Sequence, residues 1–405
     1  MDPLRNPYTP NAGAEPEAVV GRDDQLASFD LLLARLERGR TEQSMIITGL
    51  RGVGKTVLLG QFRTKALAAQ WTVVELEVSK HDETEFRLDL ATRLRSALLD
   101  LSPKVRWTER FHHAAAVLKS FTLSASADGN WALGLDVDAA EGFADHQNLA
   151  ADLTDVFIAL GEAAKEHGHG VVLLFDEVQF LSRAQLEALI EALHKMVQRK
   201  LPVTLVGAGL PQIAELAGDA KSYAERLFKF PAISNLSPDD ARRALTMPAD
   251  DEGVTWSVEA LTEAVKTTGG YPYFLQELGY VTWAIAEGNR VELSNVRDAA
   301  DAYEAKLDGS FFRVRLDRAT ALQRAYLRAM AELGPDAQKA ADVAERMGRT
   351  SENLAPTRAE LINMGLLYTP EFGYAAFTVP HFDKFMMRAV PVLEVPELKR
   401  RRRTR

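Results

Sequence analysis

The sequence predicts an α/β fold: a parallel sheet with helices on both faces, followed by a helical unit and a smaller C-terminal unit. Short apolar runs alternate with helical patterns up to about residue 233. Each apolar run lacks a polar face, which is typical of strands that are buried on both sides. A glycine-rich loop also separates the first apolar run from the helix that follows it.

Length and composition narrow the class of protein. The chain has 405 residues, with 48 Lys and Arg against 57 Asp and Glu, and a formal net charge of −9. Its 46% hydrophobic content is typical of globular proteins. The absence of cysteine excludes disulfides, thiolate metal sites and cysteine nucleophiles. No secretory pattern and no run of the ~18 apolar residues of a membrane helix are found, so we expect a cytoplasmic protein with no membrane partner.

The alternating pattern defines the elements of the first unit. Residues 1–20 are rich in Pro, Asn, Ala and Glu and predict a lead-in without regular structure. The predicted strands are Ser44–Thr48, Trp71–Val78, Val171–Phe175 and Val203–Val206. The predicted helices are Gln25–Leu36, Val57–Gln70, Phe86–Leu101, Leu149–Ala164 and Arg183–Gln198.

The segment 103–142 breaks this alternation. Two strand-like runs, Phe121–Ala127 and Trp131–Val137, flank Asp128-Gly129-Asn130, which suits a tight turn. The sequence therefore predicts a hairpin inserted into the first unit, which spans 21–233.

After Ile233 we expect no further strands until a C-terminal hairpin. Residues 234–310 contain four predicted helices: Pro238–Met247, Val258–Thr268, Tyr273–Glu287 and Ser294–Leu307. Residues 311–395 contain three more, Ala319–Leu333, Ala340–Met347 and Glu352–Met364, and then a hairpin of Leu366–Tyr368 and Tyr374–Val379. This order predicts a winged helix, followed by a basic tail at 396–405.

The loop from Gly49 to Thr56 matches G-x-x-x-x-G-K-[ST], a phosphate-binding P-loop, between a predicted strand and a predicted helix. Glycines let backbone N–H groups face a polyphosphate, and the helix presents its positive end there. Lys55 would reach the outer phosphates and the Thr56 hydroxyl would bind Mg²⁺. The alternative is a glycine-rich turn without a ligand. The predicted nucleotide-binding residues here are Gly49, Gly52, Val53, Gly54, Lys55, Thr56 and Val57.

The apolar run Val171–Phe175 ends in the carboxylates Asp176 and Glu177. The carboxyl end of such a strand opens on the ligand crevice of a parallel sheet. Asp176 suits a Mg²⁺ contact, and Glu177 suits orienting and deprotonating an attacking water. Alone, this acidic pair would indicate a helix cap. Together with the P-loop it predicts a nucleoside triphosphatase, a P-loop NTPase that binds its nucleotide with Mg²⁺.

At these motifs the chain resembles the AAA+ ATPases, and within them the bacterial relatives of origin-recognition initiators, which grade into the STAND signalling ATPases. The resemblance covers roughly 15–390 and rests on Val19–Arg22, the P-loop, Asp176–Gln179 and the domain order. It implies an AAA+ core at 21–233, a helical lid at 234–310, and ATP or ADP with Mg²⁺ as the ligand.

The resemblance also implies roles for single residues. Val20, Gly21 and Arg22 would pack on adenine; the alternative is an ordinary hydrophobic lead-in. Arg226 would act as an arginine finger in the site of a neighbouring subunit, which requires a homo-oligomer; the alternative is a surface salt bridge.

Two positions depart from the AAA+ pattern. The strand Val203–Val206 ends in Gly-Ala-Gly, without the polar residue that senses the γ-phosphate, and Thr204 lies too early to replace it. The lid segment Gly269–Phe274 lacks the usual arginine and resembles the STAND pattern, in which Pro272 would contact the nucleotide; the alternative is a helix-starting proline. A STAND-like lid implies slow hydrolysis and a nucleotide-dependent switch.

The charges bear on DNA binding. From Phe311 to Arg405 there are 17 Lys and Arg against 11 Asp and Glu, and without Lys399–Arg405 there are 11 of each. Because nucleic-acid affinity needs a basic face, the neutral winged helix favours a structural or protein-docking role, while the tail could bind RNA, DNA or an acidic protein. Two functions stay open: an assembling ATPase that associates with DNA, and a slowly hydrolysing switch that acts through protein partners.

Overall fold

The computed structural model describes residues 1–11, 13–79, 82–101, 108–124 and 137–397. Its main sheet contains β1 (Ser44–Thr48), β2 (Thr72–Glu77), β3 (Val171–Asp176), β4 (Val203–Gly209) and β5 (Phe228–Lys229). The strands lie in the order β2-β3-β4-β1-β5, and every neighbouring pair is parallel. The predicted parallel α/β fold is confirmed. The two-residue β5 was not predicted, because it is too short to show a period.

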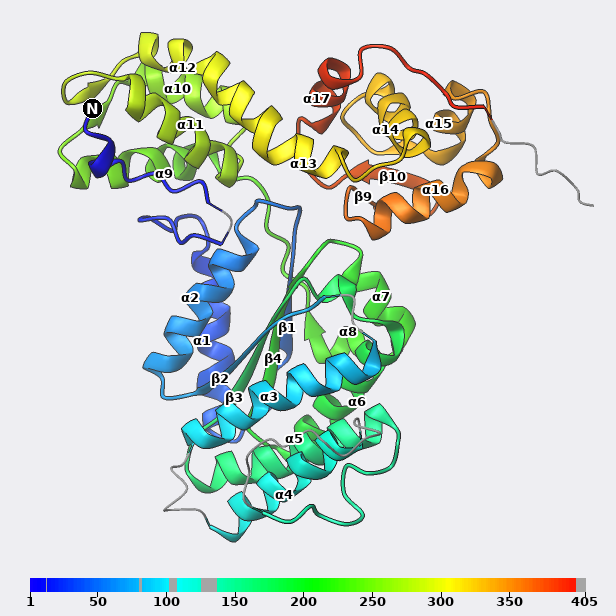
Figure 1. The fold of residues 1–405 in the computed structure, drawn as a ribbon. Coiled ribbons are helices and arrows are strands. Elements are labelled where there is room, and N and C mark those ends of the chain that lie inside the picture. The colour runs from blue at the N-terminus through cyan, green and yellow to red at the C-terminus, as the bar shows by residue number, and fades with distance from the viewer. Residues whose placement is uncertain (12, 80–81, 102–107, 125–136, 398–405) are drawn as a thin grey trace, which may run out of the picture.

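Both faces of the sheet are covered by helices (Figure 1). Along β3, Val172 and Leu174 pack toward α1 and α2, whereas Leu173 and Phe175 pack toward α3, α5 and α6. Because successive side chains of a strand point to opposite faces, this continuous apolar run serves both layers. The covering helices are α1 (Asp23–Glu37), α2 (Lys55–Ala68), α3 (Glu83–Leu101), α5 (Leu149–Glu166) and α6 (Arg183–Arg199). Shorter helical segments follow β3, β4 and α7: η3 (Val178–Phe180), α7 (Ile213–Ala220) and α8 (Ala224–Leu227).

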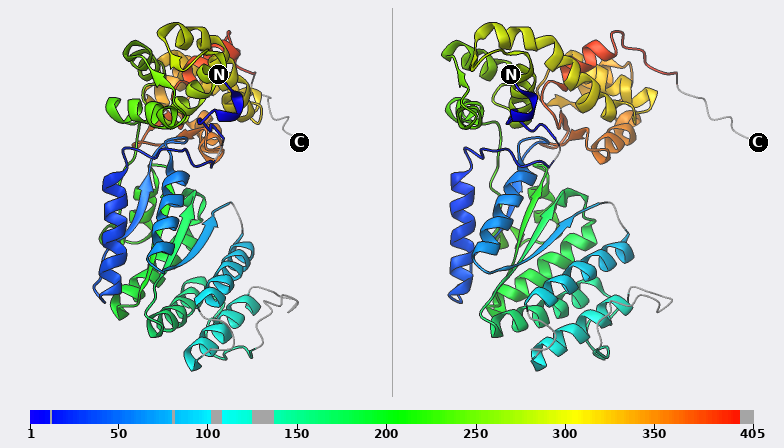
Figure 2. Two further views of the ribbon diagram at one scale, coloured as in Figure 1. Left: turned by 90° about the vertical axis from the view of Figure 1, so that its left-hand side faces the viewer. Right: turned by 60° about the vertical axis from the view of Figure 1, so that its left-hand side comes forward.

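The predicted hairpin within 103–142 is wrong at its first strand. Residues 121–123 belong to helix α4 (Glu109–Leu123), at the end of the α/β unit that is remote from the lid (Figure 2). Phe111, Leu118 and Phe121 are buried there with side chains of α3 and α5, and their spacing fits a helical face. Residues 125–136, including the predicted turn, lie outside the described residues. Val137, the last residue of the predicted second strand, is not in a strand.

The predicted helical lid is present as α9 (Pro238–Asp251), α10 (Val258–Thr268), α11 (Pro272–Ile285) and α12 (Leu293–Lys306). The expectation that strands stop after Ile233 is wrong, because β6 (Thr255–Trp256) pairs in parallel with β7 (Arg290–Val291). These two-residue strands are defined by their partners and leave no period in the sequence. From α12 the chain continues through a π-helical turn, η4 (Leu307–Phe312), into α13 (Arg313–Leu316). The lid is therefore joined to the C-terminal unit by a continuous helical segment and the short turn 317–320 that follows it.

The C-terminal unit contains the three helices and the hairpin that the sequence predicts. They are α14 (Ala321–Leu333), α15 (Ala340–Arg346), α16 (Ser351–Asn363), β9 (Leu367–Tyr368) and β10 (Tyr374–Phe377). Two further elements were not predicted: β8 (Gln338–Lys339), which pairs antiparallel with β10, and α17 (Phe382–Ala389). The predicted tail, from residue 398 on, lies outside the described residues.

The N-terminal segment is largely irregular, as expected, apart from the short helix η1 (Pro3–Arg5). It is nevertheless firmly packed on the lid. The Tyr8 hydroxyl donates to the Leu245 carbonyl at 2.6 Å and accepts from Trp256 Nε1 at 3.0 Å, and Trp283 Nε1 donates to the Asp2 carbonyl at 2.9 Å. The segment therefore runs along the lid before it enters the α/β unit. No helix among the described residues is long and apolar enough to cross a membrane.

Candidate functional site

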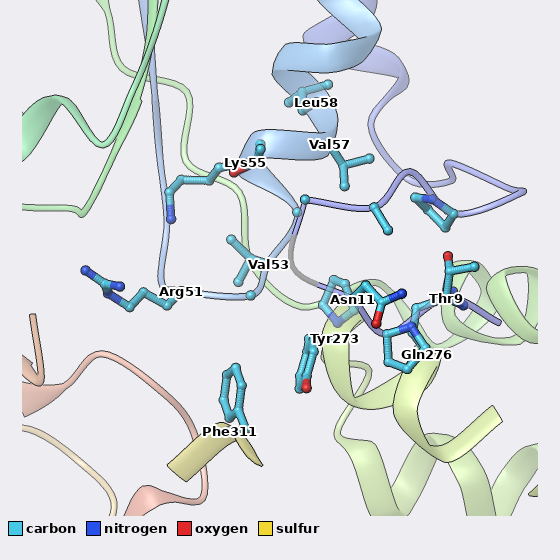
Figure 3. A pocket seen from close by; sticks show the side chains of 18 of the residues that line it. Thr9, Asn11, Arg51, Val53, Lys55, Val57, Leu58, Tyr273, Gln276 and Phe311 are labelled. Carbon is cyan, nitrogen blue, oxygen red and sulfur yellow. The ribbon is translucent and has the colours of Figure 1, made fainter. Parts of the chain in front are cut away.

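A pocket of about 620 Å³ lies where the P-loop, the lid, the N-terminal segment and the C-terminal unit meet. This volume is within the usual range of small-molecule sites. Figure 3 shows Lys55 of the P-loop, Thr9 and Asn11 of the N-terminal segment, and Tyr273 and Gln276 of α11 around it. The predicted site residues that line it are Val20, Arg22, Gly52, Val53, Gly54, Lys55, Thr56, Val57, Glu177 and Pro272.

The remaining predicted residues stand in different relations to this pocket. Gly21 lies between two lining residues, and the Gly49 carbonyl accepts a hydrogen bond from Lys55. Asp176 is hydrogen-bonded to Thr56. Arg226 does not line the pocket: it is exposed on the short helix α8, beside β5.

The P-loop conformation requires its glycines. Gly52 and Gly54 have φ values of 85° and 93°, in the left-handed region that residues with a side chain avoid. Gly49 is required for space, because a Cβ atom there would lie 2.5 Å from the Ile233 carbonyl oxygen. The loop is thus held open at the carboxyl end of β1 and directly before α2.

Lys55 is buried at the first position of α2, with 7% of its surface exposed. Its Nζ donates to the carbonyls of Gly49 at 3.0 Å and Leu50 at 2.8 Å. Burial lowers the pKa of Lys55, and Arg51 adds to this effect, while Glu177 and Asp176 oppose it. A buried ammonium group that is bonded only to carbonyls would be stabilised by an anion, which suits a phosphate ligand.

Thr56 and Asp176 form the second part of the site. Thr56 Oγ1 donates to Asp176 Oδ2 at 2.6 Å, and the Glu177 N–H donates to Asp176 Oδ1 at 2.8 Å. Burial raises the pKa of Asp176, although both hydrogen bonds and Lys55 act to lower it. A hydroxyl and a carboxylate side by side are the oxygen ligands that Mg²⁺ takes together with nucleotide phosphates. In the described part of the chain, no group of three or more His, Asp or Glu could hold a metal ion by itself.

Glu177 follows Asp176 in a left-handed conformation, with φ of 53°, at the edge of the pocket. Its Oε2 accepts a hydrogen bond from Gln179 Nε2 and lies 3.8 Å from Arg51 Nη2. Gln179 Oε1 in turn accepts from the Leu210 N–H at 3.0 Å, directly after β4. Gln179 thus links Glu177 to the end of β4, where the sequence shows no polar side chain. The sequence analysis assigns no role to Gln179. Its position two residues after Glu177 is the signal that could have identified it as a site residue.

Thr204 has no part in the pocket. It is 1% exposed, and its hydroxyl lies 2.9 Å from that of Ser44, in the interior of the sheet. Its position within β4 is the one expected from the sequence.

Arg22 connects the P-loop to the segment that precedes the lid. Its Nη2 donates to the carbonyls of Val53 at 3.0 Å and Ser234 at 2.8 Å. Burial lowers the pKa of Arg22, and Asp240 opposes this effect. The guanidinium therefore holds the P-loop and residue 234 together at the side of the pocket that Val20 also lines.

The lid contacts the P-loop directly. The Tyr273 N–H donates to the Gly52 carbonyl at 3.2 Å, and the Tyr271 hydroxyl donates to the Arg51 carbonyl. Pro272 is both the first residue of α11 and a lining residue of the pocket, so its helix-starting position and its proximity to a ligand are compatible.

The C-terminal unit also contacts the P-loop, which the sequence did not predict. The Arg51 N–H donates to the Thr378 carbonyl at 3.1 Å. A Cβ atom on Gly365 would lie 2.5 Å from Arg51 Nη2, so the two segments are in close contact. Residues 364–366, between α16 and β9, therefore line the same pocket as the P-loop.

Two family models match the chain. Residues 18–206 match the AAA ATPase domain, which includes the P-loop, strands β1 to β3 and the first four residues of β4. Residues 309–386 match a domain of unknown function, DUF8462, which begins within η4 and ends within α17. No curated protein matches the sequence.

The fold is similar to that of solved structures. The Walker-type ATPase PABY2304 of Pyrococcus abyssi is 16% identical and superposes with a TM-score of 0.55, covering 92% of this chain and 97% of that one. This likeness shows a shared fold over nearly the whole length. The Aeropyrum pernix Orc1 protein in complex with DNA is 16% identical, with a TM-score of 0.45 and coverage of 93% and 94%. The Thermotoga maritima RuvB Holliday junction branch migration motor is 14% identical, with a TM-score of 0.46 and coverage of 93% and 96%.

Proposed function

We propose, because residues 18–206 match the AAA ATPase domain, that this chain binds ATP with Mg²⁺ between core and lid and hydrolyses it to ADP and phosphate. The main support for the proposal is the 2.6 Å hydrogen bond from the Thr56 hydroxyl to Asp176 Oδ2, because these residues lie 120 positions apart in the sequence. It joins the P-loop to the acidic end of β3, with Lys55 and Glu177 on the same pocket.

Each residue has a defined task in this proposal. The P-loop N–H groups and the Lys55 ammonium hold the phosphates, while Thr56 and Asp176 would hold Mg²⁺. The ion supplies charge neutralisation to the phosphate oxygens when bound. Glu177 orients a water and accepts its proton as the water oxygen bonds to the γ-phosphorus. The bond from that phosphorus to the bridging oxygen breaks, and ADP leaves with the electron pair.

The contacts of Glu177 fix the orientation of its carboxylate in this arrangement. Gln179 and Arg51 both engage its Oε2, so Oε1 is left to accept a proton from water. The second candidate function, a STAND-like switch, is favoured by one observation: the lid and the C-terminal unit both bond to the P-loop, at Gly52 and Arg51. A change in the nucleotide would thereby reach the C-terminal unit.

The C-terminal unit and Arg226 also have roles in this proposal. We retain residues 311–395 as a winged helix that acts through a protein partner, because the segment after α16 is engaged at the P-loop and the unit has 11 Lys and Arg against 10 Asp and Glu. Nucleic-acid binding through the tail is the alternative. We retain Arg226 as a finger in trans, since it is exposed and forms no ion pair with any described residue.

The test is to measure ATP binding and ATP turnover in two variants. Lys55→Ala should abolish ATP binding, because Lys55 supplies the one ammonium group among the described residues that line the pocket. Glu177→Gln should keep binding and lower kcat by about 10²- to 10⁴-fold, the usual contribution of a general base.

Lys65→Ala is the control, because Lys65 is on the same helix but ion-pairs with Asp30 at 2.8 Å on the surface. It should leave both quantities unchanged. An unchanged hydrolysis rate in Glu177→Gln would remove the role given to Glu177, and normal ATP binding by Lys55→Ala would contradict the site itself.

A further inference from the structure

The pocket carries an excess of positive charge from two separate regions of the chain. Arg22, Arg51 and Lys55 belong to the start of α1 and to the P-loop. Arg315 and Arg318 come from α13 and the turn after it, at the junction of the lid and the C-terminal unit. Glu177 is the one carboxylate among the described lining residues. Such a surplus of cations around one pocket favours a polyanionic ligand.

Arg315 is fixed in place without an anionic partner among the residues that the structure describes. Its guanidinium lies over the Phe311 ring, with 4.1 Å from Cζ to the ring centroid, and donates through Nη1 to the Phe311 carbonyl. It forms no ion pair with any residue that the structure describes. Burial lowers its pKa, and the charge of Arg51 lowers it further. The guanidinium groups of Arg315 and Arg51 thus repel each other. An anion bound between them would remove this repulsion.

The position of Arg315 is tied to the P-loop through an aromatic stack. Phe311 stacks on Tyr273 with a centroid distance of 4.4 Å and an interplanar angle of 18°. The Tyr273 N–H donates to the Gly52 carbonyl. Helix α11 itself contributes no Lys or Arg, so the lid side of the pocket takes its cations from α13 and the following turn.

We infer that Arg315 and Arg318 bind the phosphate groups of the nucleotide from within the same chain, as a second cationic side of the P-loop site. The guanidinium of Arg315 is suited to two parallel hydrogen bonds to phosphate oxygens. The inference rests on the proposed function. It adds that the number of phosphates is sensed at the junction between the lid and the C-terminal unit, because α13 forms that junction.

The test compares ATP, ADP and AMP as ligands of the full chain, by equilibrium binding. Arg315→Ala should weaken ATP binding about ten- to hundredfold, the loss expected for charge-assisted hydrogen bonds, and AMP binding by less than about threefold. Arg315→Lys should recover part of the ATP affinity, since it restores the charge without the planar fork. Arg318→Ala, at an exposed position, should weaken ATP binding less than Arg315→Ala does. Its effect on ATP affinity should disappear at high salt, because salt screens exposed charges.

Arg313→Ala is the matched control. Arg313 lies on the same short helix, but it is exposed and outside the pocket, so its removal should change no affinity. The thermal midpoint of each variant, measured without nucleotide, separates a folding defect from a binding defect.

Three results would overturn the inference. If Arg315→Ala and Arg318→Ala bind ATP as the parent does while Lys55→Ala does not, the proposed function stands and the inference fails. If Arg315→Ala loses ATP, ADP and AMP equally together with thermal stability, its role is packing on Phe311. If the parent chain itself binds no ATP, the proposed function fails first.

Discussion

Packing requires glycine at Gly49 in the P-loop but not at Gly60 in the neighbouring helix α2. A Cβ atom at Gly49 would lie 2.5 Å from the Ile233 carbonyl oxygen and 2.9 Å from Val53 Cγ2. The approach is fixed by the Ile233 N–H, which donates to the Thr48 carbonyl at 2.8 Å. Gly60 lies inside α2, and a Cβ atom there would meet nothing within 4 Å, so no contact requires glycine at that position.

We therefore expect opposite effects of the same substitution. Gly49→Ala should lower the free energy of unfolding by about 1–3 kcal/mol, because the backbone of Ile233 must move away. Gly60→Ala should raise it by about 0.5–1 kcal/mol through the better helix propensity of alanine. Denaturant unfolding of both variants measures the two changes. Equal stability of Gly49→Ala and the parent would mean that the contact between the P-loop and residue 233 is not rigid.

At the scale of elements, the lid and the C-terminal unit meet in an aromatic cluster. His381, the residue before α17, lies 5.3 Å from the Phe274 ring of α11, with an interplanar angle of 30°. Phe274 in turn contacts Phe311 edge-on at 6.0 Å. Burial lowers the pKa of His381, Lys384 and Arg388 lower it further, and Asp383 opposes them. The neutral imidazole is thus the form that this interface favours.

This shift predicts a pH dependence with a definite sign. An unfolded histidine has a pKa of about 6.5. Because the folded pKa is lower, the stabilisation by His381 is complete above about pH 6.5 and is lost as the pH falls below it. Lowering the pH from about 7.5 to about 5.5 should therefore reduce the thermal midpoint more in the parent than in His381→Asn. The Asp155 hydrogen bond raises the pKa of His146 and acts with the opposite sign, so the comparison between these two chains isolates His381. Equal losses in both would show that the interface does not depend on the charge of His381.

At the scale of the whole molecule, Arg226 stands apart from the pocket of its own chain. It lies on α8 beside β5, one of the two edge strands of the sheet, whereas Glu177 directly follows β3. If Arg226 completes the site of a neighbour, turnover per chain should rise with protein concentration, and Arg226→Ala should lower it at least about tenfold at all concentrations.

Mixing gives the decisive control for this prediction. Glu177→Gln keeps its Arg226, and Arg226→Ala keeps its Glu177, so a mixture of the two inactive variants should regain turnover only when Arg226 acts between chains. Turnover that is independent of concentration, with nucleotide retained through purification, would instead support the switch.

The sequence by itself determined those features that are encoded by consecutive residues. The strand, P-loop and helix around 44–68 form one local unit, and an apolar strand that ends in Asp176 and Glu177 predicts both the parallel sheet and its acidic tip. The tertiary structure alone decided which distant segments meet: Thr9, Arg315 and Gly365 line one pocket although they are far apart in the chain. It also decided that 121–123 is helical and that two-residue strands such as β6 and β7 exist. The physical reason is that periodicity and turn chemistry act between near neighbours, whereas long-range packing and the hydrogen bonds of short strands depend on partners that no local pattern specifies.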